Sequence, residues 1–193
     1  LAKTIRTKNA IMLVFSLMFY AWGEPKYVVL LIGMALADWG FALLIERHRG
    51  SGLARLWVFA ACFVSLGLLG IFKYGTFALT NLQALSGFPA AVPQIALPIG
   101  ISFYTFQILS YVIDVYRGEV VAQRSFPHLL MYVSLFHQCI AGPIVRYKDI
   151  SDEIFNRRST PSEFSAGVTR FATGLAKKSL LANTCGSLTD TIL

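Results

Sequence analysis

The residues best suited to chemistry in this chain lie along one uncharged, apolar stretch. From residue 95 to residue 113 there is no charged side chain, yet polar side chains recur at helical spacing. At about 100° per residue they share one narrow face with Gly100 and Phe103; they are Gln107, Ser110, Tyr111 and Asp114. Lipid penalises such a face unless it points at protein or a water-filled cavity. The stripe therefore predicts a membrane protein with a polar interior that serves a substrate.

Two arginines are candidates for binding an anionic group near this stripe. Arg117 stands three residues after Asp114, so the two can either pair on one helix surface or form a cytoplasmic mouth for a charged donor molecule. Arg146 follows Gly142-Pro143 closely, and its planar fork suits phosphate or carboxylate, unless it only marks the membrane interface. Asp38 lies inside an apolar run, where it is either functional or a buried carboxyl bonded to a neighbouring helix.

Other enzyme chemistries find no support in the sequence. His137 and Cys139 lack partners at metal-ligand spacing, so no metal site is predicted. His128 and His137 lie nine residues apart with Pro127 beside the first, which favours hydrogen bonds between helices over a catalytic pair. The chain has no Gly-rich phosphate loop, no Gly-x-Ser-x-Gly elbow and no Cys-x-x-Cys.

The composition is that of a membrane protein. Hydrophobic residues make up 55% of the chain and charged residues 14%, and the mean hydropathy is +0.60, whereas roughly a quarter of a soluble domain is charged. The net charge of +7 lies in short basic clusters between apolar runs, which fits membrane lipid headgroups and cytoplasmic loops rather than nucleic acid. Three widely spaced cysteines predict no disulfide framework.

The apolar runs predict an all-α, polytopic fold that holds the stripe in place. We expect four transmembrane spans, at about 9–22, 27–45, 56–72 and 95–117. Pro98 is expected in the first turn of the last span, where a missing N–H costs little. Residues 126–145 carry no permanent charge but are interrupted by Pro127, Gly142 and Pro143. A re-entrant or broken helix there keeps the basic residues that follow on the cytoplasmic side.

An amphipathic helix is predicted after the broken segment. Thr160-Pro161-Ser162-Glu163 is a capping box with proline at the first helical position, so a helix is expected over about 161–182. Its apolar residues share one face, which places it at the cytoplasmic membrane interface. By the positive-inside rule, the basic ends of the first two spans are also cytoplasmic, and the uncharged loop 74–94 is outside.

Four ordered blocks of sequence resemble the membrane-bound O-acyltransferase family, in its bacterial branch of alginate O-acetyltransferases. They extend over nearly the whole chain, at residues 19–27, 97–118, 136–147 and 174–178. His137 departs from the family, which usually has proline there. The resemblance implies one partial domain over 1–193 that lacks the family's first membrane helix and stops before its catalytic histidine. No catalytic residue is therefore expected within this chain.

The resemblance also implies a reaction and its partners. An acetyl group would move from a cytoplasmic donor to a hydroxyl of an exported, alginate-like polysaccharide, with a downstream histidine as general base. Family analogy suggests acetyl-coenzyme A as the donor, with no bound cofactor, and an extracytoplasmic partner protein that completes acetylation. A multi-pass protein of the bacterial inner membrane is implied.

The residues alone leave two other functions open. A transporter or channel subunit would also explain Asp38 and a striped helix, although transporters often show paired broken helices in two related halves. A non-catalytic assembly subunit of a polysaccharide export system would use the same polar groups only for packing. A downstream histidine within an apolar segment would favour the enzyme, whereas a second copy of the present pattern would favour transport.

Overall fold

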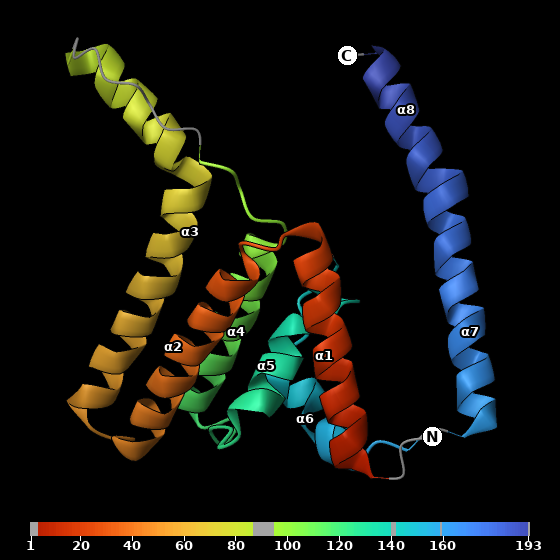
Figure 1. Cartoon of the computed structure of the whole chain (residues 1–193), viewed down its shortest axis with the longest axis horizontal. Helices are drawn as coiled ribbons and strands as arrows, with labels where there is room; N and C mark the ends of the chain where they lie inside the picture. Colours follow the sequence, from red (N-terminus) through yellow and green to blue (C-terminus); the bar gives the residue numbers. More distant parts are fainter. Residues whose placement is uncertain (1–3, 87–94, 140–141, 159, 193) are drawn as a thin grey trace. The chain divides into compact units, whose positions relative to one another are not determined.

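Every regular element in the described part of the chain is a helix, which confirms the predicted all-α class. The computed structural model describes residues 4–86, 95–139, 142–158 and 160–192 (Figure 1). The chain forms two compact units, Leu1–Asn156 and Arg157–Leu193.

Four long helices build the first unit: α1 (Ile5–Gly23), α2 (Val28–Arg47), α3 (Gly52–Ser86) and α4 (Ile101–Arg117). Helices α2, α3 and α4 pack against one another, and the short helix α5 (Phe126–Ser134) packs against α1 and α2 (Figure 1). Helices α2 and α3 are long and apolar enough to cross a membrane, which supports the membrane character indicated by composition.

Hydrogen bonds at both ends of α2 show how α4 runs beside it. At the turn between α1 and α2, the hydroxyls of Tyr20 and Tyr27 donate to backbone carbonyls just ahead of α4, at 3.0 and 3.1 Å. At the opposite end of α2, Arg49 donates to the carbonyl of Val115 at 2.8 Å. Since α4 begins beside the start of α2 and ends beside its end, the two helices are parallel.

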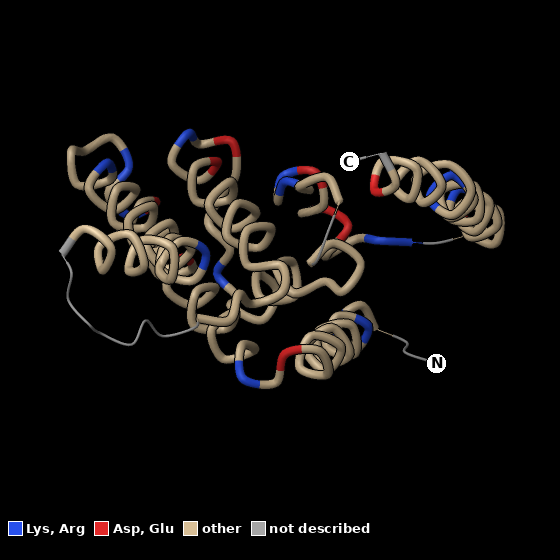
Figure 2. Tube along the Cα trace, turned by 90° about the horizontal axis from the view of Figure 1, so that it is seen from above, with Lys and Arg blue, Asp and Glu red and all other residues tan. Residues whose placement is uncertain are grey.

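Charged side chains in these helices lie mostly at the helix ends. In α2, α3 and α4, all charged residues other than Asp38 and Lys73 fall within the first or last turn. Figure 2 shows the charged positions of the first unit at a few places along the tube, with long uncharged stretches of helix between them. This distribution is expected of helices whose middle portions are in contact with lipid or with each other.

Helix α3 is longer than the predicted span 56–72. It continues to Ser86, so the part of the expected loop 74–94 that is described is helical, while residues 87–94 lie outside the described residues. The end of the apolar run is not the end of the helix, because no proline interrupts the chain between Lys73 and Ser86. Thr80 and Asn81 add hydrogen bonds to carbonyls four residues back, at 2.9 and 2.8 Å.

The start of α4 also differs from the prediction. The helix begins at Ile101, so Pro98 lies in the turn before it rather than in its first turn. Gly100 occupies the N-cap with φ of 75°, in the left-handed region that glycine adopts without steric cost. The backbone therefore turns sharply at Gly100 before α4 starts.

The helix predicted to be broken within 126–145 ends early. Helix α5 stops at Ser134, and the chain then forms a turn over residues 136–138. Gly142 has φ of 124°, which only glycine readily adopts, and Pro143 follows it. Residues 140 and 141 lie outside the described residues. An unpredicted helix, α6 (Tyr147–Asn156), comes next; its signal is the helical spacing of Tyr147, Ile150 and Ile154.

The second unit is one uninterrupted helical rod. It consists of α7 (Pro161–Ala176), a π-helical turn η1 (Lys177–Ala182) and α8 (Asn183–Ile192), so it is longer than the predicted 161–182. The predicted capping box is present: the Thr160 side chain accepts from the backbone N–H of Glu163, and the Glu163 carboxylate accepts from the N–H of Thr160 at 2.8 Å. The hydrogen bonds that the carboxylate accepts from the backbone N–H and the hydroxyl of Thr160 lower the pKa of Glu163.

Candidate functional site

The polar stripe of α4 faces the end of α5. Because α5 stops at Ser134, its last backbone carbonyls have no partner within the helix. The side-chain amide of Gln107 donates to the carbonyl of Tyr132 at 3.1 Å, and Gln138 donates to the same oxygen at 3.1 Å. Gln107 is only 2% exposed. Its buried amide thus satisfies the backbone that the broken helix leaves open.

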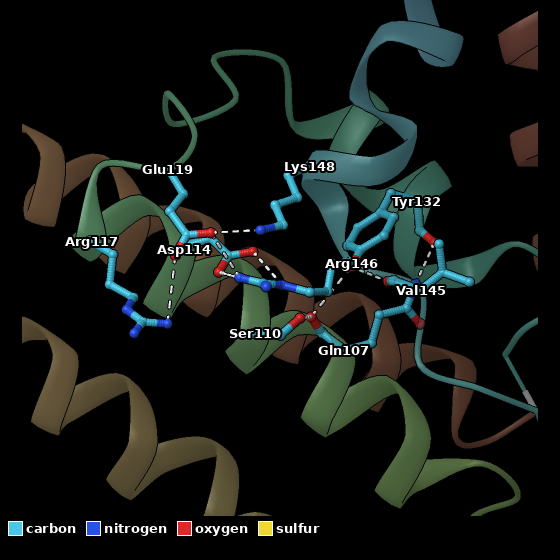
Figure 3. Close-up of polar contacts among 9 residues, drawn as sticks. All are labelled: Gln107, Ser110, Asp114, Arg117, Glu119, Tyr132, Val145, Arg146 and Lys148. Carbon is cyan, nitrogen blue, oxygen red and sulfur yellow. Dashed lines mark hydrogen bonds and ion pairs between the residues drawn. The ribbon is translucent and has the colours of Figure 1, made fainter.

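Tyr132 connects the stripe to the chain beyond the break. Its hydroxyl donates to the carbonyl of Val145 at 2.8 Å, while Ser110 donates to the backbone carbonyl of Gln107 at 2.7 Å (Figure 3). Tyr132 is fully buried. The Gln138 side chain thus binds the α5 backbone, and the Tyr132 side chain of α5 binds Val145, so contacts with α5 hold both ends of the chain between α5 and α6.

A network of charged side chains lies at the end of α4 (Figure 3). Arg146 donates from Nε to Asp114 Oδ2 at 3.1 Å and from Nη2 to Asp114 Oδ1, which is a bidentate pair. The same Nη2 lies 3.1 Å from Glu119 Oε2, and Lys148 Nζ lies 2.8 Å from that oxygen. Arg117 is 3.5 Å from the other oxygen of Glu119. Asp114, 1% exposed, is the buried member of this network.

Of the two alternatives considered for Asp114 and Arg117, the structure does not show their pairing on one helix surface. Asp114 instead takes Arg146, from a segment 32 residues away, and Arg117 turns outward to Glu119. The physical reason is geometry: a carboxylate buried against the chain after α5 is better served by a planar fork aimed at it than by a neighbour on its own helix. Arg146 binds a carboxylate, as its shape favours, and that carboxylate belongs to the chain itself.

Electrostatic effects on the exposed side of the network are mutual. The hydrogen bond from Lys148, with help from the positive charges of Arg146 and Arg117, lowers the pKa of Glu119. The hydrogen bond to Asp114 raises the pKa of Arg146. A groove of about 480 Å³ lies between the loop 119–124 and α6, so this end of the network is open to solvent.

Three tyrosines form a second cluster next to the stripe. The rings of Tyr111 and Tyr132 each contact Tyr147 edge-on, with centroids 5.0 and 5.2 Å apart. The backbone N–H of Gln123 donates to the Tyr111 hydroxyl, and its side chain donates to Tyr147, both at 2.8 Å. Tyr111 therefore binds the loop after α4.

Sequence reasoning missed several members of these clusters: Gln123, Tyr132, Glu119, Lys148 and Tyr147. The signal for Tyr132 was available, since it is a polar group within an otherwise apolar run. Glu119 and Lys148 stand next to predicted residues but belong to no helical pattern with them. Their pairing depends on the loop after α4 and the start of α6 meeting in space.

Asp38 is tied to the neighbouring helix. Ser65 of α3 donates to Asp38 Oδ2 at 2.7 Å, and both side chains are buried. Of the two alternatives considered for Asp38, the structure supports a buried carboxyl bonded to another helix. The carboxyl links α2 to α3 at the middle of both apolar runs.

The two histidines near α5 contact aromatic rings. His128 lies edge-on to Phe155 of α6, with ring centroids 5.1 Å apart, and His137 lies against Phe136 at 5.4 Å. Within the described residues, neither makes the predicted interhelical hydrogen bond, and no group of three or more His, Cys, Asp and Glu side chains could hold a metal ion.

The chain is similar over nearly its whole length to bacterial O-acetylating proteins. It is 37% identical over 190 residues to "Probable alginate O-acetylase AlgI" of Pseudomonas putida, covering 96% of this chain and 39% of the relative. The protein of the same name in Pseudomonas aeruginosa is 37% identical over 193 residues, covering 96% and 36%. "Peptidoglycan O-acetyltransferase" of Helicobacter pylori is 30% identical over 206 residues, covering 91% and 38%.

The chain therefore spans less than two fifths of the length of these curated relatives. No protein-family model matches the chain, and no solved structure matches it significantly. The first two relatives align with 96% of the chain. The chain is a homologue of the alginate O-acetylases, which confirms the resemblance to membrane-bound O-acyltransferases predicted from its four sequence blocks.

Proposed function

We propose that this chain is part of a membrane O-acetyltransferase that acetylates hydroxyls of an exported polysaccharide. The observation that carries the proposal is the 37% identity to alginate O-acetylases over 96% of the chain. The Helicobacter pylori relative is named for peptidoglycan, so the relatives differ in acceptor but share O-acetylation. The transporter and assembly-subunit alternatives gain no support from these names.

In this proposal α1 to α4 cross the inner membrane and hold a polar interior between them. Basic residues at the start of α1 and between α2 and α3 face the cytoplasm, in keeping with the positive-inside rule. The donor, acetyl-coenzyme A by analogy with the family, approaches from that side. The polysaccharide, together with an extracytoplasmic partner protein, approaches from the other.

The proposed chemistry is general-base acyl transfer. A histidine outside this chain takes the proton of the acceptor hydroxyl as its oxygen attacks the acetyl carbonyl, and the donor thiol leaves. The polar interior, with Gln107, Ser110, Tyr111, Asp114, Arg117 and Arg146 along its wall, keeps the two substrates together and excludes bulk water. The burial of Gln107, Tyr111 and Asp114 is compatible with such a wall.

The test is acetyl transfer to polysaccharide in membranes that carry the full-length gene product, compared with a product truncated after Leu193. We expect activity from the first only, because the general base lies beyond the truncation in this proposal. Absence of transfer by the full-length product, under conditions in which a Pseudomonas relative is active, would overturn the proposed function. Activity of the truncated product would overturn the placement of the base.

A further inference from the structure

The chain between α5 and α6 is held at both ends, and its described residues form no helix. We name residues 135–146 the linker segment; the structure describes 135–139 and 142–146. Near its start, Gln138 donates to the carbonyl of Tyr132, and near its end the carbonyl of Val145 accepts from the Tyr132 hydroxyl. Its last residue, Arg146, makes the bidentate pair with Asp114 of α4.

The Asp114–Arg146 pair is the strongest of these contacts on physical grounds. Asp114 is 1% exposed, whereas the Arg146 side chain is 35% exposed, so the carboxylate is the group that needs a partner. Removing one member of such a pair leaves a buried charge without compensation. Both Nε and Nη2 of Arg146 are directed at carboxylates of the chain, as Figure 3 shows. Its fork is thus occupied without any ligand.

We propose that Asp114 and Arg146 are positioning residues, a latch that holds the linker segment against α4. In this reading Arg146 acts on transfer through the place of the linker segment and not by contact with the acyl donor. The effect on transfer rests on the proposed function, but the effect on the linker segment does not. The two can therefore be measured separately.

The chain contains a natural reporter of the latch. Cys139 belongs to the linker segment and is 1% exposed. In the full-length protein, with every other cysteine replaced by alanine, the rate of N-ethylmaleimide labelling measures how often the linker segment opens. We expect Asp114→Asn and Arg146→Gln to raise the labelling rate of Cys139 about tenfold or more.

Arg124→Gln provides the matched control. Arg124 pairs with Glu46 of α2 at 2.7 Å, so its loss removes an arginine–carboxylate pair that does not involve the linker segment. We expect labelling of Cys139 in this variant at the wild-type rate. Equal labelling in wild type, Asp114→Asn and Arg146→Gln would overturn the latch, whatever the activities are.

Exchange of the two charges separates positioning from donor binding. The double variant D114R/R146D keeps the pair but moves the positive charge to α4. Its Cys139 should be labelled more slowly than Cys139 in Asp114→Asn or in Arg146→Gln. Arg146→Lys, which keeps the charge without the bidentate fork, should label at an intermediate rate. Two results together would overturn the role of the bidentate guanidinium: labelling of Cys139 in D114R/R146D as fast as in Asp114→Asn and Arg146→Gln, and labelling in Arg146→Lys at the wild-type rate.

Steady-state kinetics complete the distinction. A latch predicts that Arg146→Lys lowers kcat with little change in the KM for acetyl-coenzyme A, and that D114R/R146D regains part of kcat. A rise in that KM, without recovery in the swap, would assign Arg146 to donor binding and overturn the positioning role. If the wild type transfers no acetyl group, the proposed function fails while the labelling result still decides the latch.

Discussion

Gln107 illustrates how a buried polar residue can be required by the backbone of another element. Its amide and that of Gln138 donate to one carbonyl, that of Tyr132, yet Gln107 is buried and Gln138 is only half-buried. A buried hydrogen bond in a membrane protein contributes on the order of 1 kcal/mol. The polar stripe therefore has a structural task at this position, independent of any substrate.

We expect Gln107→Met to reduce the free energy of unfolding in detergent by about 1 kcal/mol, since methionine preserves the volume but cannot donate. Gln138→Met should reduce the free energy of unfolding clearly less, because the Gln138 amide is only half-buried and water can take its place as a donor. The measurement is thermal unfolding of the purified protein. A larger loss in Gln138→Met than in Gln107→Met would show that the Tyr132 carbonyl does not depend on the stripe.

Glu119 predicts a pH dependence of the charged network. Lys148 lowers the pKa of Glu119 below its ordinary value of 4.5. A carboxylate with a lowered pKa stabilises the folded state above the ordinary value, and this contribution is lost as the pH falls through the lowered one. We expect the difference in unfolding temperature between wild type and Glu119→Gln to be present at pH 7 and to shrink below pH 4.5.

Lys148→Met serves as the control for this prediction. Lys148 is the main cause of the lowered pKa of Glu119. In a protein that already carries Lys148→Met, adding Glu119→Gln should therefore change the pH dependence of the unfolding temperature much less than it does in the wild type. If Glu119→Gln has the same pH-dependent effect on the unfolding temperature with and without Lys148→Met, then groups other than Lys148 lower the pKa of Glu119.

At the scale of elements, α2 and α3 are joined by a polar contact within their apolar runs. Ser65→Ala leaves the Asp38 carboxyl buried with one partner fewer. In a double-mutant cycle with Asp38→Ala, we expect a coupling free energy of about 0.5–1.5 kcal/mol. Thermal unfolding of the four variants in detergent provides the measurement.

Ser16→Ala is the matched control for this cycle. Ser16 is also a fully buried serine, but its hydroxyl has no hydrogen-bond partner among the described residues. We expect no coupling between Ser16→Ala and Asp38→Ala. Coupling near zero for Ser65 as well would mean that the two helices do not rely on this contact.

At the scale of the whole first unit, the helix directions predict which turns share one side of the membrane. The turn between α2 and α3 and the loop after α4 lie at the same end of α2, and the turn between α1 and α2 lies at the other (Figure 1). We expect cysteines introduced at 51 and 121 to be labelled from the cytoplasm by an impermeant maleimide, and one at 26 from outside. Labelling of all three from one side would show that α2 does not span the membrane.

Much of the architecture was predictable from local sequence. The all-helical class, the turn near 23–27, the capping box at Thr160 and the buried face of α4 follow from hydropathy, helical periodicity and capping chemistry, each of which acts within a few residues. The same local signals misplaced the end of α3, because loss of hydrophobicity does not by itself terminate a helix. They also missed α6, a ten-residue amphipathic helix with several charges.

The sequence by itself determined that this is a helical membrane protein related to O-acetylases, since composition, periodicity and ordered motifs are properties of the chain. Only the tertiary structure decided the partners of the polar residues: Asp114 with Arg146, Gln107 with the carbonyl of Tyr132, and Asp38 with Ser65. The physical reason is that a buried polar group bonds to whatever the fold brings within about 3 Å. That proximity joins residues 25 to 32 positions apart, beyond the range of any local pattern.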